Sequence, residues 1–202
     1  GIQVTISNRE RRRQGDANVA SVAGEQMGGS LRRREANDII ALYDTFTKSV
    51  GGASATLDIT TFRGDVAYLL TDNDSAYGPA PMPLHAALHI EQISDIILDI
   101  TDPGTAPANR PTGPFSEMIK GWWRGNDRLY GVAIWHSGNI ARDSGDAAKG
   151  ALKHQNSLVL VEEGTAEAVD EMDNSSRLTE FGLWKSWGEA LQIDVHGVEI
   201  YS

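Results

Sequence analysis

Apolar side chains recur every four residues in the first quarter of the chain, a spacing that places them on one face of a helix. The stripe comprises Val19, Ala23, Met27 and Leu31 and resumes at Ile39, Leu42, Tyr43 and Phe46. It predicts a single helix over residues 16–46, with Asp16 as N-cap and a length of about 45 Å at 1.5 Å per residue. Such a helix is a spine, longer than an ordinary globular helix. Gly24, Gly28 and Gly29 lie inside it and indicate a bend or the close approach of another backbone.

Shorter patterns predict the remaining elements. Strands are expected at residues 2–6, 84–90, 129–135, 178–187 and 198–201, and helices at 61–70, 91–100 and shortly after 114. Small, polar and proline residues mark a linker at 49–54 and loops at 71–83 and 101–114. Because helices and strands follow no regular βαβ order, the pattern predicts an α+β fold.

Two packing expectations follow from these elements. The spine helix should lie against the long strand near the end of the chain, in the region of Phe181, Leu183 and Trp184. Alternation along that strand should place Phe181 and Leu183 on one face and Leu178 and Trp184 on the other. The helix at 61–70 should bury its apolar face, which consists of Phe62, Val66, Leu69 and Leu70.

Composition narrows the possible classes of protein. The 202 residues include no cysteine, which excludes a disulfide framework, a thiolate metal site and cysteine catalysis. No apolar run reaches the ~20 residues that a membrane span needs. The net charge of −10 argues against a dedicated nucleic-acid binder, which normally carries a basic surplus.

The charge is distributed unevenly along the chain. Residues 1–34 carry seven arginines against three acidic residues, or +4, which leaves −14 for the rest of the total of −10. A basic end and an acidic body attract each other when copies of the chain meet. The candidate subunit-interface residues are therefore Arg9, Arg11, Arg12 and Arg13, with solvated faces and intrachain pairing as the alternative.

No catalytic, cofactor or metal site is predicted. His85 and His89 have the spacing of a two-histidine zinc motif, but alanine follows the first where a zinc peptidase has glutamate. On a strand the two rings would lie about 13 Å apart. The acidic run 162–173 could bind a divalent ion or a basic neighbour, and a solvated loop is the simpler interpretation. Trp122, Trp123 and Arg124 form a further candidate interface anchor, with a core pair as the alternative.

Several segments resemble one family in the same order along the chain. The segment LRRREANDIIALYDTF resembles the end of the spine helix of tailed-bacteriophage major capsid proteins with the Hong Kong 97-like fold, and VTISNRERRRQGD resembles the basic strand before it. TFRGDVAYLLTDN, HAALHIEQISDII and WWRGNDRLYGVAIWHSGNIA resemble the family's axial domain, and LTEFGLWKSWGEALQIDVHGVEIYS resembles its long closing strand.

The resemblance implies a non-enzymatic shell subunit. It implies a peripheral domain with the spine helix at 1–50 and 153–190, and an axial domain at 51–152 and 191–202. Copies would form pentamers and hexamers of an icosahedral virion capsid, assembled in the host bacterial cytoplasm around double-stranded DNA that is contacted non-specifically. Portal, scaffold and decoration proteins are further candidate partners, and no membrane or cofactor is implied.

One departure from the family concerns the start of the chain. The strand pattern begins directly at Gly1, whereas the family has an N-terminal arm and an extended loop before the spine helix. An upstream segment is therefore expected to have been removed or omitted. Two alternatives remain open: an encapsulin-like nanocompartment shell, and a metal-dependent hydrolase that uses His85 and His89.

Overall fold

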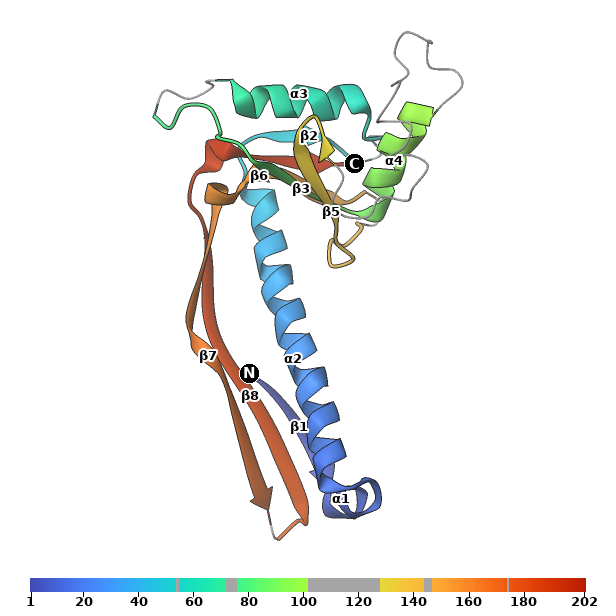
Figure 1. The fold of residues 1–202 in the computed structure, drawn as a ribbon, viewed down its shortest axis with the longest axis vertical. Coiled ribbons are helices and arrows are strands. Elements are labelled where there is room, and N and C mark those ends of the chain that lie inside the picture. Colours follow the sequence, from blue (N-terminus) through green and yellow to red (C-terminus); the bar gives the residue numbers. More distant parts are fainter. Residues whose placement is uncertain (54, 72–75, 102–127, 144–146, 174) are drawn as a thin grey trace. The chain divides into compact units, whose positions relative to one another are not determined.

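The computed structural model describes residues 1–53, 55–71, 76–101, 128–143, 147–173 and 175–202 (Figure 1). The chain divides into two compact units, and each is built from two separated stretches. The first unit comprises Gly1–Ile39 and Leu160–Glu189, and the second comprises Ile40–Val159 and Ala190–Ser202. None of the described helices combines the length and apolar character that a membrane span requires.

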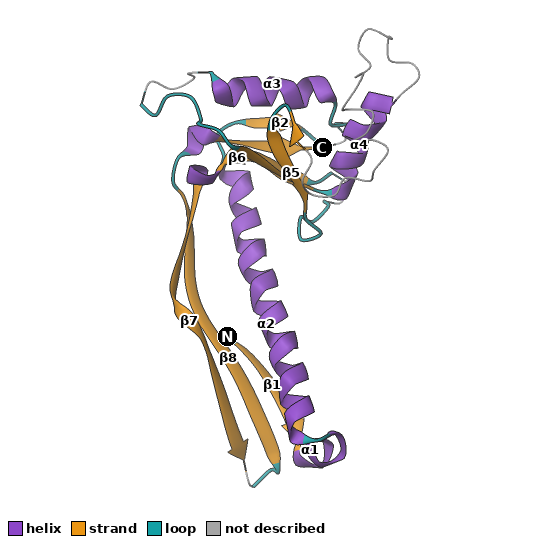
Figure 2. Cartoon of the chain, viewed as in Figure 1, coloured by secondary structure: helices purple, strands orange, loops and turns teal. Residues whose placement is uncertain are grey.

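The first unit contains a long helix and a three-stranded sheet. Its helices are α1 (Asn8–Gln14) and α2 (Asp16–Ala41), and its strands are β1 (Ile2–Ser7), β7 (Leu158–Asp173) and β8 (Leu178–Leu191). The strand order is β1-β8-β7. Figure 2 shows β7 and β8 as two long strands that run side by side.

The spine helix is confirmed as one continuous helix. It runs without a break through Gly28 and Gly29 to Ala41, and a 3₁₀ turn, η1 (Leu42–Thr45), continues it almost to Phe46. Among the described residues, an added Cβ would meet nothing within 4 Å at either of these glycines or at Gly24, so no other backbone in the described part of this chain approaches them. The side chain of Asp16, predicted as the N-cap, lies outside the described residues.

The apolar stripe of α2 faces the sheet. Val19, Ala23, Met27 and Leu31 are all buried. Val19 and Ala23 line a cavity of about 400 Å³ together with Val4 and Ile6 of β1.

The register between β1 and β8 decides which residues of the long strand face α2. β1 pairs antiparallel with β8 in a register that sets Ile2 opposite Leu183 and Val4 opposite Phe181, and cross-strand partners share a face. Phe181 and Leu183 therefore face the helix as predicted. Trp184 points to the opposite face and is 55% exposed, as the alternation of the strand predicts.

A six-stranded mixed sheet forms the second unit. Its strands are β2 (Ser49–Gly51), β3 (Leu84–Leu88), β4 (Arg128–Leu129), β5 (Val132–His136), β6 (Lys149–His154) and β9 (Gly197–Tyr201), in the order β2-β9-β6-β3-β5-β4. β2 runs parallel to β9 and β3 parallel to β5, and the other pairs are antiparallel. The 3₁₀ turns η3 (Gln155–Ser157) and η4 (Asp194–His196) complete this unit.

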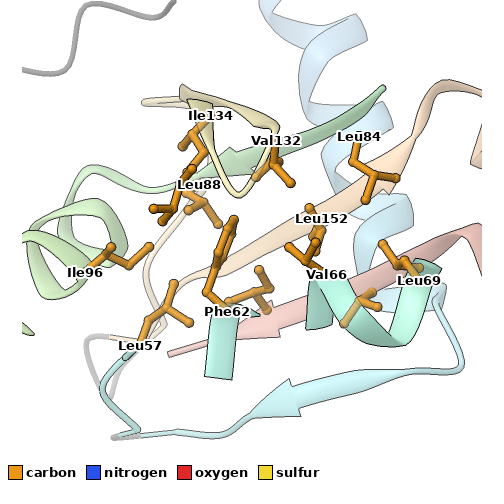
Figure 3. Close-up of a cluster of buried hydrophobic side chains, with 14 of the residues drawn as sticks. Leu57, Phe62, Val66, Leu69, Leu84, Leu88, Ile96, Val132, Ile134 and Leu152 are labelled. Carbon is orange, nitrogen blue, oxygen red and sulfur yellow. The ribbon is translucent and has the colours of Figure 1, made fainter. Parts of the chain in front are cut away.

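Two helices supply the core that packs on this sheet, α3 (Ile59–Leu70) and α4 (Ile90–Thr101). Phe62 and Leu69 of α3 and Ile96 of α4 pack among sheet residues in one apolar cluster (Figure 3). The sheet residues of that cluster include Leu84, Ala86, Leu88, Val132, Ile134, Leu152, Val198 and Ile200. On β3 the buried positions alternate with half-buried ones, as expected for a strand with one face on the core.

Several sequence-based boundaries needed correction in this unit. The expected linker at 49–54 contains β2, and Leu70, expected in the core, is 42% exposed. The expected strand at 129–135 is a hairpin of β4 and β5. Tyr130 and Gly131 form its turn, with φ values of 54° and 83° that a two-residue hairpin turn requires. The strand at 84–90 and the helix at 91–100 are confirmed as β3 and α4. The helix expected after residue 114 lies outside the described residues.

Candidate subunit interface

The predicted basic cluster lies on α1 of the first unit. Ser7 caps this helix, since its hydroxyl accepts a hydrogen bond of 3.2 Å from the backbone N–H of Glu10. Arg11 donates from its guanidinium to the hydroxyl of Thr179 on β8 at 2.7 Å, which ties α1 to the sheet. Arg9, Arg12 and Arg13 are exposed. Three of the four predicted arginines are thus free to face solvent or another molecule, whereas Arg11 has an intrachain role.

The acidic run predicted as a solvated loop is instead a strand. Residues 162–173 belong to β7, and every residue from 161 to 173 is exposed. β7 forms one edge of its sheet, because β8 is its neighbour and no described strand lies on its other side. The sequence did not reveal this strand because glutamate and alanine, which are depleted in strands, dominate it.

Lys185 is a residue that the sequence interpretation missed. Its ammonium lies 2.7 Å from a carboxylate oxygen of Glu35 on α2 and 3.1 Å from one of Glu162 on β7. Hydrogen bonding to Glu35 and then to Glu162 raises the pKa of Lys185. Lys185 therefore connects the spine helix to the hairpin within the first unit and pairs with the carboxylate of Glu162.

The histidines do not form a metal site in the described part of the chain. His85 lies on β3 opposite Lys153, and the Nδ1 atom of His89 accepts a hydrogen bond of 3.3 Å from the N–H of Glu91. No group of three or more potential ligands occurs among the described residues. His154 and His196 are buried with ring centroids 6.2 Å apart, and His154 uses Nδ1 to accept a bond from the N–H of Asn156.

Polar groups within the second unit fix its helices to the sheet. Gln92 is buried and donates to the carbonyls of Ala148 and Ile200 at 2.9 and 3.1 Å, while its own oxygen accepts from the N–H of His89. Lys149 pairs with Asp44 and lies 3.4 Å from Glu199. These contacts are structural, since each joins elements that already pack together.

Asp65 is one of three residues with a buried side-chain atom that finds no hydrogen-bond partner in the described part of the chain, beside His196 and Glu199. It lies on α3 with 4% exposure, and the atom without a partner among the described residues is Oδ2. Burial raises the pKa of Asp65 to about 7, against an opposing effect of Lys48. The predicted interface residues Trp122, Trp123 and Arg124 lie outside the described residues.

Comparison of the sequence with protein-family models gives no match, and comparison with curated proteins gives none either. Solved structures do match over nearly the whole chain. The structure titled Mycobacterium phage Che8 is 16% identical, with a TM-score of 0.64 over 98% of this chain and 68% of that one. The head of the Helicobacter pylori bacteriophage KHP40 is 10% identical, with a TM-score of 0.68 over 100% of this chain and 73% of that one.

An encapsulin is equally similar. The holo-SrpI encapsulin complex of Synechococcus elongatus PCC 7942 is 12% identical, with a TM-score of 0.68 over 98% of this chain and 71% of that one. The chain thus has the mixed helix-and-sheet fold of tailed-phage major capsid proteins, which confirms the predicted resemblance at the level of the fold. Because an encapsulin matches as well, the fold is shared by phage capsids and encapsulin shells.

Proposed function

We propose that this chain is a major capsid protein that self-assembles into pentamers and hexamers of an icosahedral phage shell around double-stranded DNA. The observation that carries the proposal is a fold likeness over 98–100% of the chain to a phage head and to other shell-forming proteins. A likeness confined to one unit would indicate only a shared domain. The likeness here includes the spine helix, the long hairpin and the six-stranded sheet, which favours a shell subunit over a protein that shares one domain with such subunits.

The proposal includes the Hong Kong 97-like division of the chain. Residues 1–50 and 153–190 would form the peripheral domain and residues 51–152 and 191–202 the axial domain. The support is that each of the two compact units consists of two separated stretches, with the spine helix and the long hairpin in one and the large sheet in the other.

The side chains support a structural rather than a catalytic role. The buried polar residues that have partners connect elements, as Gln92 connects α4 to β9 and to Ala148, the residue just before β6. The buried His154 and His196 lie against each other, and the described residues contain no cluster of three metal ligands. A hydrolase that uses His85 and His89 would need such a cluster, so this alternative has the least support.

Partners and location follow from the same proposal. The shell would form from copies of the chain in the host bacterial cytoplasm, and portal, scaffold or decoration proteins would join it. A net charge of −10 favours no more than non-specific contact with packaged DNA. Trp122, Trp123 and Arg124 remain candidate interface residues beside the arginines of α1.

The second candidate function is an encapsulin-like nanocompartment, favoured by the match to the SrpI encapsulin. The two functions differ in what the shell contains, since one holds DNA and the other holds a cargo protein. Both predict a closed shell of the same subunit.

The experiment is expression of the chain followed by sedimentation and electron microscopy. Shells, or rings of five and six subunits, are the expected result. Nuclease-protected DNA in particles from the natural source would favour the capsid, and a single co-purified cargo protein would favour the nanocompartment. A protein that stays monomeric up to millimolar concentration would overturn both.

A further inference from the structure

The first unit carries opposite charges at opposite edges of its sheet. In the order β1-β8-β7, β1 forms one edge and leads directly into α1, while β7 forms the other edge. α1 holds four arginines and one glutamate. Residues 161–173 of β7 hold six carboxylates and no cation. A copy of this chain therefore has a basic helix at one side of the sheet and an acidic strand at the other.

The basic helix is held in place by one of its cations, and the other three are exposed. Arg11 anchors α1 to β8 through Thr179, so the helix that carries the other arginines is fixed on the sheet. Arg9, Arg12 and Arg13 are exposed and form no ion pair within the described part of the chain. Three cations on two turns of a helix form a compact patch that an acidic surface could cover.

The acidic strand has the features of an uncovered interface. Val161, Val169 and Met172 are each more than half exposed, and the outer backbone edge of β7 has no described strand beside it. An exposed edge with apolar side chains invites pairing unless charge or another element protects it. Glu162 is engaged by Lys185 and Asp173 by Ser175 and Ser176, whereas four carboxylates have no partner in the described residues. These are Glu163, Glu167, Asp170 and Glu171.

The sign of the charge on β7 indicates which surface can bind at this edge. A second β7 would set carboxylate against carboxylate, and DNA would present phosphates of the same sign, so both are disfavoured. The basic α1 of a second copy has the opposite sign. We propose that β7 of one copy binds α1 of the next copy in a head-to-tail contact, with Arg9, Arg12 and Arg13 facing Glu163, Glu167 and Glu171, the unpaired carboxylates at alternate positions of the strand.

This contact deepens the proposed function and rests on it. Because the two surfaces differ, the contact is heterologous, and a heterologous contact repeats from copy to copy until it closes a ring or network. That property suits a shell. Each exposed pair changes an interface equilibrium constant by about 1.4- to fivefold, and reversing one charge replaces the attraction by a repulsion of similar size, so three reversals change the constant by roughly tenfold or more.

Three charge-reversal variants of the whole chain test the contact. The first carries Arg9→Glu, Arg12→Glu and Arg13→Glu, the second carries Glu163→Arg, Glu167→Arg and Glu171→Arg, and the third combines all six. A control with the same change in net charge as the first variant reverses three other exposed arginines, with Arg32→Glu, Arg33→Glu and Arg63→Glu. Assembly is measured by sedimentation and electron microscopy, and circular dichroism checks that each variant is folded.

The equilibrium constant for assembly should fall at least tenfold in each of the first two variants. The third variant should recover assembly. A 1:1 mixture of the first two should co-assemble, since each supplies the surface that the other has reversed. Assembly of the parent should also weaken between 0.05 and 1 M salt, where the Debye length falls to about 3 Å.

The outcomes separate the two ideas. A parent chain that forms no assembly overturns the proposed function and this contact with it. A parent that assembles while the first variant assembles equally well overturns the contact alone. So does a folded six-substitution chain that recovers nothing, or a control that fails as severely as the first variant, because the effect would then belong to net charge.

Discussion

The buried carboxyl of Asp65 should make the second unit less stable at alkaline pH than at mildly acidic pH. Asp65 lies on α3 next to the core residues Phe62, Val66 and Leu69, with 4% exposure and an Oδ2 atom that no described residue binds. Removing an ionised carboxylate from water is unfavourable, and this burial raises the pKa from 3.8 to about 7. Lys48 favours the ionised form but offsets only part of the effect.

The size of the effect follows from the difference in pKa between the two states. Between pH 3.8 and about 7 the unfolded chain releases a proton that the folded chain keeps, so stability falls as the pH rises through this window. At 1.36 kcal/mol per pKa unit, the full difference is at most about 4 kcal/mol. About 2 kcal/mol of it is expected between pH 5.5 and 8.5.

Asp65→Asn removes this titration, so its stability should not show that fall. Urea denaturation at pH 5.5, 7.0 and 8.5 gives the free energy of unfolding, and hydrogen exchange of the α3 amides isolates the second unit. Glu91→Gln is a matched control, because it also removes one carboxylate. The side chain of Glu91, on the neighbouring helix α4, is 47% exposed. The control should keep the pH dependence of the parent.

The comparison uses the slope with pH rather than the absolute stability, because the new amide of asparagine also needs hydrogen-bond partners. Equal slopes for the parent and Asp65→Asn would mean that the carboxyl is not held protonated near neutral pH. The account of its burial would then be wrong.

Two glycine predictions concern packing. Gly28→Ala and Gly29→Ala should raise the free energy of unfolding by up to ~1 kcal/mol each, and with it the melting temperature, because both lie in the middle of α2 with open space where a Cβ would go; a lower melting temperature would contradict this. Gly150→Ala should lower stability by about 1–3 kcal/mol in urea denaturation, since its Cβ would lie 2.7 Å from the carbonyl of Ala87. Gly64→Ala, in open space on α3, is the control that should not destabilise, and equal effects at both sites would refute the steric argument.

The sequence predicted the elements that have strong periodicity. Val19, Ala23, Met27 and Leu31 specify the helical face of α2 because one face alone meets the sheet, and the three glycines did not break the helix since tertiary packing outweighs their local cost. On β8, Phe181 and Trp184 differ by an odd number of positions. Strand alternation therefore places them on opposite faces, and this rule overrides the preference of tryptophan for a buried site.

The acidic strand β7 was harder to predict. β7 has no alternating apolar face, because every residue from 161 to 173 is exposed in a single copy of the chain. Its strand conformation comes from pairing with β8, a partner that sequence periodicity does not reveal. The hairpin turn at Tyr130 and Gly131 was missed for a related reason, since tyrosine is not a residue that normally marks positive φ.

Asp65 and His154 act on the second unit in opposite directions, which gives its stability a dependence on pH that neither group would produce alone. His154 is buried, and desolvation, followed by the nearby His196, His85 and Lys153, lowers its pKa. The unfolded chain therefore gains a proton below about pH 6.5 that the folded chain resists, so stability falls as the pH falls.

The rise that Asp65 produces toward low pH partly hides this fall in the parent. In an Asp65→Asn background the urea midpoint should decrease from pH 7.5 to 5.5, and adding His154→Gln should reduce that decrease. Adding His136→Gln, at an exposed position, should leave it unchanged. A flat midpoint in Asp65→Asn alone would show that the histidine pair does not resist protonation, and the buried contact between His154 and His196 would then have no part in the pH response.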